Sequence, residues 1–132
     1  MQMPASKTVP QSSPQKLETI RRRADFLAAA RAAHSAQRGL VLQARVRDDE
    51  RGHRVGFTVT KKVGNAVVRN RVKRRLRAAA RLELSQVGRP GVDYVLIGRK
   101  ATINRDFALL RDDLAKAVRK VHMETNRREG AL

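Results

Sequence analysis

Two segments in the first half of the chain alternate between apolar and polar residues. From Leu40 to Arg47, apolar side chains occupy every second position and therefore share one face. Residues 54–60 repeat this pattern, and a polar turn at 48–52 separates the two segments. Two half-buried strands joined by a short polar turn predict an antiparallel hairpin.

Residues 20–33 and the segment that starts at Phe107 follow a helical period instead. The first segment is rich in alanine, which favours a helix, although its start offers no good N-cap. In the second segment, apolar residues spaced three or four apart continue to Val121. They predict an amphipathic closing helix with Asn104 as its cap.

The longest helical pattern covers residues 66–84 and separates an apolar stripe from a basic arc. The stripe consists of Val68, Val72, Leu76, Ala79 and Leu82. The opposite arc carries Asn70, Arg71, Lys73, Arg74, Arg77 and Arg81. After this helix, residues 93–99 are apolar on both faces, which is typical of a central strand.

The predicted order is therefore helix, two strands, basic helix, strand and helix. This order is typical of an α+β domain in which helices pack on a small mixed sheet, and a further short strand is possible near Lys61. We expect the folded domain to span residues 17–123. The Pro-rich residues 1–16 predict a disordered tail, and the polar residues 124–132 predict a frayed one.

Composition narrows the class of protein. The 132 residues suffice for one domain, and 30 Lys and Arg against 12 Asp and Glu give a net charge of +18. No cysteine is present, so disulfides and thiolate metal sites are excluded, and the three histidines lack the spacing of metal ligands. No apolar run approaches the roughly 18 residues of a membrane span, and we expect a cytoplasmic protein without membrane contact.

The positive charge is concentrated in one part of the chain. Residues 51–82 contain eleven Lys or Arg residues and no Asp or Glu. Like charges one helical turn apart, such as Lys73 and Arg77, repel each other, and nothing nearby in the sequence offsets this. A phosphate backbone would offset it, so the pattern indicates a polyanion as partner, with binding that weakens steeply with salt.

The segment that carries this charge also resembles a known family. Residues 54–77 contain a strand that ends in Lys61-Lys62, a Gly-Asn-Ala helix entry at 64–66, and an Arg-Asn-Arg-x-Lys-Arg helix at 69–74. This signature resembles the protein subunit of bacterial ribonuclease P. The resemblance extends from Ile20 to Val121 and includes the Asp-Phe pair of the first helix and the later strand.

The resemblance implies an αβββαβα fold like the second domain of ribosomal protein S5, with a left-handed βαβ crossover. It also implies a protein that binds the catalytic RNA of ribonuclease P and precursor tRNA, with no obligate protein partner. That holoenzyme removes the 5′ leader from precursor tRNA. Its chemistry belongs to the RNA and its Mg²⁺ ions, so we expect no cofactor on this chain alone.

The resemblance also implies which residues contact RNA. The expected RNA-binding residues are Lys61, Lys62, Asn65, Arg69, Asn70, Arg71, Lys73, Arg74 and Arg77. Arginine suits this role because it pairs with phosphate through two hydrogen bonds. We expect Gly64 to permit a strained turn and Asn65 to cap the helix, although backbone N–H groups there are also suited to hold a phosphate.

A second expected contact is a cleft for the leader between the first helix and the sheet. Its expected residues are Phe26, Gln43, Arg45, Thr58 and Thr60. Phe26 is suited either to stack on an unpaired base or to pack in the core, whereas Tyr94 fits the core better. Ala30 and Gln43 occupy positions where the family often has aromatics, so the stacking surface is reduced.

The chain offers no convincing catalytic residues of its own. The acidic residues at 48–50 fit a solvated turn, and Asp112 and Asp113 fit surface charge on the last helix. His53 and His122 have no partner that the sequence reveals. The alternatives to a ribonuclease P subunit are a ribosomal or general RNA-binding protein and, more remotely, a metal-dependent nuclease.

Overall fold

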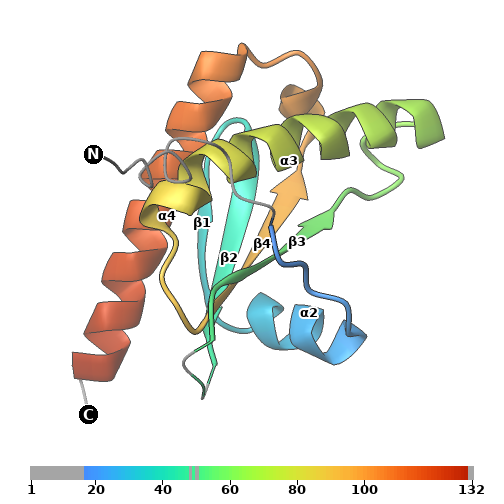
Figure 1. Ribbon diagram of the computed structural model, residues 1–132. Helices are drawn as coiled ribbons and strands as arrows, with labels where there is room; N and C mark the ends of the chain where they lie inside the picture. Colours follow the sequence, from blue (N-terminus) through green and yellow to red (C-terminus); the bar gives the residue numbers. More distant parts are fainter. Residues whose placement is uncertain (1–16, 48, 50, 131–132) are drawn as a thin grey trace, which may run out of the picture.

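A four-stranded mixed sheet with helices on both faces organises the residues that the computed structural model describes, namely 17–47, 49 and 51–130 (Figure 1). The elements in chain order are α2 (Arg23–Ala30), β1 (Ala33–Ala36), β2 (Leu40–Val46), β3 (Arg54–Thr58), α3 (Ala66–Val87), β4 (Val92–Gly98), the 3-10 helix η1 (Lys100–Ile103) and α4 (Phe107–Gly130). The expected α+β class is confirmed. The expected tail at 1–16 lies outside the described residues, and α4 extends beyond Glu124.

The predicted hairpin between the first two alternating segments is wrong. The strand order is β1-β2-β4-β3, with β4 antiparallel to β2 and parallel to β3. The backbone N–H of Arg47 donates to Gly91 O at 2.7 Å, and the N–H of Gly91 donates to Arg51 O at 2.6 Å. The polar turn thus holds the start of β4, which enters the sheet between β2 and β3. Gly91 adopts a φ of 76°, which favours glycine.

The extra strand lies before the alternating segments, not near Lys61. β1 pairs with β2 through Ala33 to Ala36, at the end of the predicted helix 20–33, whereas residues 61–63 form a turn. The helix itself is limited to Arg23–Ala30, and Arg22 at its N-cap makes no side-chain cap bond. The chain before it pairs with the outer edge of β3, since Val55 bonds Glu18 O and Ile20 N at 2.8 and 2.9 Å.

The two faces of the sheet bury different amounts of apolar surface. α3 and α4 cover one face, where Leu40, Leu42, Val55 and Leu96 join a large core. α2 covers the other face with a small cluster in which Ile20, Ala29 and Val95 are buried, with Phe26 and Ile97 partly buried against it. Burial of β4 on both faces confirms its predicted central place.

α4 begins with a cap other than the predicted Asn104. The Asp106 carboxylate accepts hydrogen bonds from the N–H groups of Ala108 and Leu109 at 3.1 and 3.3 Å, whereas Asn104 ends η1. Asp113 is also not the expected surface charge. It is buried, and it accepts bonds from Gly39 N and from the Arg105 guanidinium. A carboxylate with these partners fastens the β1–β2 turn to α4.

Tyr94 is fully buried, as predicted. It is also the partner of His53 and His122, for which the sequence revealed none. Its hydroxyl accepts from Arg89 N at 2.9 Å and lies 2.6 Å from Nε2 of His122. The ring of His53 packs edge-on against the same tyrosine. Burial, helped by the charge of Arg89, lowers the pKa of His122 to about 4.

A buried carboxylate also joins the sheet strands to α2. Asp93 on β4 is fully buried and accepts bonds of 2.7–3.1 Å from Arg45, Arg47 and Arg54. Burial raises the pKa of Asp93, but the hydrogen bonds and charges of Arg54 and Arg47 outweigh this effect, so the pKa lies below its usual value. Arg45 and Arg54 then pair with Asp25, which fixes α2 on the sheet.

We predict that stability decreases as the pH falls from 6.5 to 4, and that His122→Gln reduces this loss. The unfolded chain protonates His122 near its ordinary pKa of about 6.5, whereas the folded chain resists protonation until about 4. The difference corresponds to at most about 3 kcal/mol, and solvent screening of the partly exposed ring reduces the expected loss to about 2 kcal/mol. Urea unfolding at several pH values tests this, with the exposed His34→Gln as control. An equal pH dependence in both variants would contradict the prediction.

We also predict that Asp93→Asn lowers the free energy of unfolding by about 3 to 5 kcal/mol, because it leaves partly buried guanidinium groups without their common counter-charge. Asp112→Asn removes the same charge from an exposed position and should change stability by less than about 0.5 kcal/mol. Denaturant unfolding of both variants measures the difference. Equal stabilities would show that the arginines do not depend on Asp93.

Candidate nucleic-acid interface

The N-terminus of the basic helix α3 is capped by a side chain. The side chain of Asn65 accepts a hydrogen bond from Val68 N at 3.0 Å, which confirms the predicted cap. The predicted strained turn at Gly64 is wrong, since Gly91 is the one glycine of positive φ among the described residues. The absence of a side chain at Gly64 instead leaves room for Val68, because a Cβ at position 64 would lie 2.7 Å from Cγ1 of Val68.

One side of α3 packs into the core and fixes the direction of the other. Val72, Leu76 and Ala79 of the predicted stripe are buried, as are Ala80 and Leu84. Val68 and Leu82 are only half-buried. The inward face therefore lies about where the helical period places it, and the arginines on the opposite arc must point outward.

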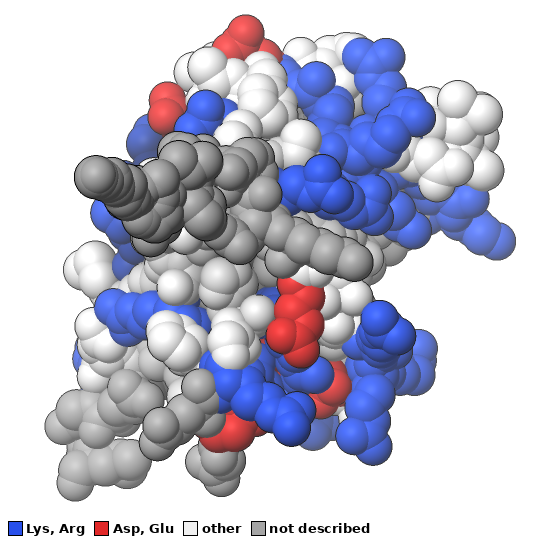
Figure 2. Space-filling view, in the orientation of Figure 1, with Lys and Arg blue, Asp and Glu red and all other residues white. Residues whose placement is uncertain are grey.

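The outward side of α3 forms a continuous positive surface, which we call the α3 basic face. It consists of Arg69, Asn70, Arg71, Lys73, Arg74 and Arg77. Arg69 and Lys73 are half-buried and the others are exposed, and none of the six forms an ion pair with another described residue. Figure 2 shows Lys and Arg side chains gathered over part of α3, without red atoms among them. This arrangement confirms that the cations gather on one side.

Arg75, which the helical period places outside the basic arc, differs from the arginines of the α3 basic face. Its guanidinium donates to Thr102 O at 3.0 Å and to Arg105 O. These bonds tie α3 to the segment around η1. Arg75 therefore supports the fold and does not belong to the α3 basic face.

Lys61 and Lys62 extend this positive surface towards the sheet. Both are exposed in the turn between β3 and α3, while the next residue, Val63, is buried. Val63 N donates to Thr60 O at 3.0 Å, which closes the turn. The two lysines therefore stand beside the N-terminus of α3, where backbone N–H groups are also free to hold an anion.

A groove runs between α2 and α3 along the edge of β3. Its volume is about 560 Å³, and it is lined by Arg21, Arg23, Phe26, Phe57, Thr58, Val59 and Lys73. No carboxylate of the described residues lines it, so the groove offers cations and aromatic surface together. The sequence reasoning did not select Arg21 or Arg23, although three consecutive arginines at the start of a helix were a visible signal.

Phe26 combines the two roles that were left open for it. Its ring packs on the sheet so closely that a Cβ on Gly56 would lie 2.6 Å from the ring, yet the ring remains half-buried and lines the groove. On the opposite wall, the Arg77 guanidinium lies 5.4 Å from the centroid of the Phe57 ring. Arg77 therefore connects the α3 basic face with the groove.

The other expected cleft residues are only partly brought together. Strand alternation places Gln43, Arg45 and Thr58 on the face that α2 covers, and Thr58 lines the groove beside Phe26. Arg45 instead pairs with Asp25 and Asp93. Gln43 is half-buried away from the groove wall, and Thr60 is exposed beyond the end of β3.

Several carboxylates of the described residues are engaged in ion pairs or hydrogen bonds. Asp49 pairs with Arg47 at 2.9 Å, and this hydrogen bond lowers the pKa of Asp49, whereas positions 48 and 50 lie outside the described residues. Within residues 17–47, 49 and 51–130, no group of three His, Cys, Asp or Glu side chains is placed to hold a metal ion. No helix in this part of the chain is long and apolar enough to cross a membrane.

Comparisons with known proteins agree with this geometry. The family model described as Ribonuclease P matches residues 15–122. The ribonuclease P protein component of Ruegeria pomeroyi is 57% identical over 109 residues, which cover 80% of this chain and 87% of that protein. The protein component of Caulobacter vibrioides is 51% identical over 104 residues, which cover 78% of this chain and 70% of that protein.

Solved structures give the same result. The RNase P protein of Staphylococcus aureus matches with a TM-score of 0.66 and 27% identity, covering 80% of this chain and 98% of that one. The RNase P protein from Thermotoga maritima matches with a TM-score of 0.63 and 29% identity, covering 75% and 93%. The chain therefore belongs to the family of bacterial ribonuclease P protein components, the protein subunits of the endoribonuclease that processes the 5′ end of precursor tRNA.

Proposed function

We propose that the α3 basic face binds the phosphate backbone of ribonuclease P RNA and of precursor tRNA. The observation that carries this proposal is the set of outward cations on α3 without carboxylate partners among the described residues. Repulsion along the helix costs free energy in the isolated chain, and a bound phosphate backbone relieves it. Asn70 adds an amide donor and acceptor within the same surface.

In this proposal, the groove along β3 receives the single-stranded leader. Arg21, Arg23 and Lys73 line it with positive charge, and the accessible part of the Phe26 ring offers a surface for base stacking. Neither Ala30 nor Gln43 adds a second aromatic ring. Contacts to the leader then depend more on phosphate pairing than on stacking.

The chemical step belongs to the RNA in this proposal. In the holoenzyme, Mg²⁺ held by the catalytic RNA would supply the chemistry that removes the leader and leaves a 5′ phosphate on the mature tRNA. The buried carboxylates of Asp93 and Asp113 accept hydrogen bonds from arginines of this chain, so they stabilise the fold. The chain contributes substrate recognition, and we expect it to need no protein partner.

The parallel pair β3 and β4, joined through α3, forms a βαβ unit. We propose that this unit has the left-handed crossover and the ribosomal protein S5-like arrangement that the family resemblance implies. The unit matters for function because it presents α3 on the sheet.

Reconstitution with the cognate catalytic RNA tests the proposed function. At low Mg²⁺, we expect the chain to increase both cleavage of precursor tRNA and affinity for it, and the gain should grow with leader length. Binding of structured RNA without any dependence on the leader would favour a general RNA-binding protein. Cleavage by the chain without the RNA subunit would overturn the assignment of the chemistry to RNA.

We predict that the double variant Arg69→Ala and Arg71→Ala weakens RNA binding but leaves thermal stability nearly unchanged. Neither side chain forms an ion pair with a described residue, so folding loses little. Each lost phosphate contact should reduce the slope of log affinity against log salt by about 0.7 to 0.9. Filter binding at several salt concentrations and thermal unfolding measure the two effects.

Arg75→Ala is the matched control for this experiment. It removes a charge from the same helix, but it also breaks two bonds to backbone carbonyls, so stability should fall by about 1 to 3 kcal/mol. A large loss of stability in the Arg69 and Arg71 variant would instead mean that those arginines serve the fold.

A further inference from the structure

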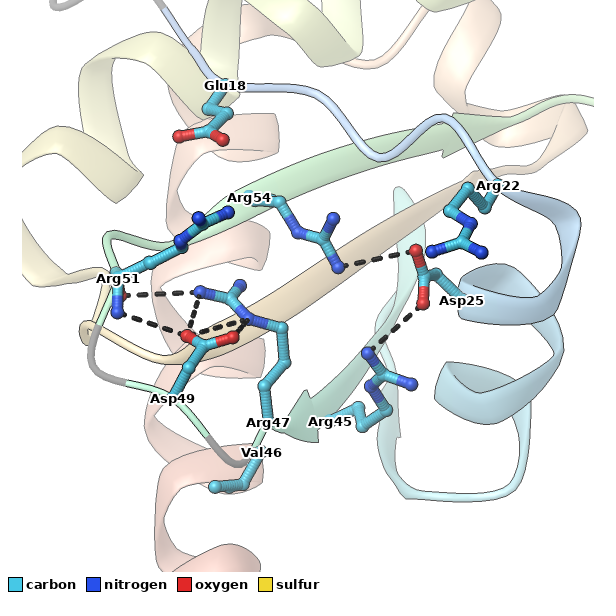
Figure 3. Close-up of a pocket in the computed structure, with 9 residues that line it drawn as sticks. All are labelled: Glu18, Arg22, Asp25, Arg45, Val46, Arg47, Asp49, Arg51 and Arg54. Atoms are coloured by element: carbon cyan, nitrogen blue, oxygen red, sulfur yellow. Dashed lines mark hydrogen bonds and ion pairs between the residues drawn. The ribbon is translucent and has the colours of Figure 1, made fainter.

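A second cavity lies on the α2 side of the sheet, at the opposite end from Lys61 and Lys62. Five arginines point into or line it, and we call it the arginine cavity (Figure 3). These residues are Arg22, Arg45, Arg47, Arg51 and Arg54, and the carboxylates Glu18, Asp25 and Asp49 line the same cavity. The volume of the cavity is about 520 Å³, which is enough for a phosphate group and part of a nucleotide.

Three of these arginines are held in place by the fold. Arg45, Arg47 and Arg54 bond the buried Asp93, and Asp25 and Asp49 take further bonds from them. The two bonds to Asp25 are long, at 3.3 and 3.4 Å. Nε of Arg45 is buried and has no hydrogen-bond partner among the described residues. The cavity is therefore lined by guanidinium groups that the fold holds in place through Asp93, Asp25 and Asp49.

The other two arginines are free at the rim. Arg22 and Arg51 are exposed, and neither guanidinium pairs with a carboxylate of another described residue. Figure 3 shows Arg22 beside Asp25 at one side of the cavity and Arg51 at the other, with Arg54 between them. Guanidinium groups that approach one space from several directions suit a tetrahedral oxyanion.

The cavity is also connected to the groove along β3. A hollow between them is lined by Arg21, Arg22 and Arg54 together with Leu17, Glu18 and Thr19. It shares Arg21 with the groove and the other two arginines with the arginine cavity. The consecutive arginines at the start of α2 thus point to both sites, and an RNA strand that leaves the groove would pass from one to the other.

We propose that the arginine cavity binds a phosphodiester of RNA, with Arg22 and Arg51 as the contacts at its rim. This inference rests on the proposed function, since it adds a second phosphate site to the same RNA-binding surface. The phosphodiester comes either from the catalytic RNA or from the precursor leader beyond the groove. Both sources supply the same chemistry, so the experiment has one arm for each.

The test compares the double variant Arg22→Ala and Arg51→Ala with the control Arg119→Ala and Arg127→Ala. The control removes the same charge from exposed positions of α4, which covers the other face of the sheet. Neither pair forms ion pairs among the described residues, so both variants should fold with unchanged thermal midpoints. Because both double variants lose two positive charges, the difference between their RNA affinities does not include the effect of net charge.

One arm measures binding of each full-length variant to the catalytic RNA alone. The other measures binding of precursor tRNAs with short and long leaders to the reconstituted holoenzyme. We expect the Arg22 and Arg51 variant to bind about tenfold more weakly than the control in one arm, as loss of a charged hydrogen bond implies. Weaker binding in the first arm identifies the catalytic RNA as the source of the phosphodiester. Weaker binding that is confined to precursors with long leaders identifies the leader as the source.

Equal affinities of the two variants in both arms would overturn the inference. The wild-type chain separates this result from a failure of the proposed function. If the wild type gives no gain in leader-dependent affinity, the proposed function fails. If the wild type and the control give that gain and the Arg22 and Arg51 variant matches the control, only the arginine cavity loses its assigned role.

Discussion

The bond network around Asp93 determines how the positive charge of this chain is arranged. One buried carboxylate on the central strand holds arginines from both neighbouring strands, and two of these arginines hold α2 through Asp25. Acidic residues are few, and this one is used inside the domain, where low polarity strengthens its interactions. The cations of α3 are left without internal counter-charges, so their partner must come from outside.

The sequence allowed the helical and central elements to be predicted, because their patterns are local. The apolar stripe of α3 and the two apolar faces of β4 follow directly from residue spacing. Strand pairing was not predictable in the same way, since β4 enters between two strands that precede it by many residues. The bonds that direct this insertion come from backbone groups around Gly91, which no side-chain pattern reveals.

The candidate site was predictable to a similar extent. Helical period alone placed Arg71, Arg74 and Arg77 on an outward face. It also left Arg75 outside the basic arc, but it revealed neither the carbonyl partners of Arg75 nor the ion pair that the fold makes with Arg45. Arg21 and Arg23 were missed because the predicted helix began too early, so their place beside the β3 edge depended on a tertiary contact.

The open edge of β3 affects how the free protein, not yet bound to RNA, associates with other copies of itself. Among the described residues, those at 18–20 cover only the first part of that edge, and the remainder faces the groove. An uncovered strand edge invites pairing with a second chain, which leads to aggregation. Arg21, Arg23 and Lys73 flank this edge, and a second chain with the same large positive charge is repelled from it. The charges that suit the groove to RNA thus also keep newly made chains from associating through their sheets.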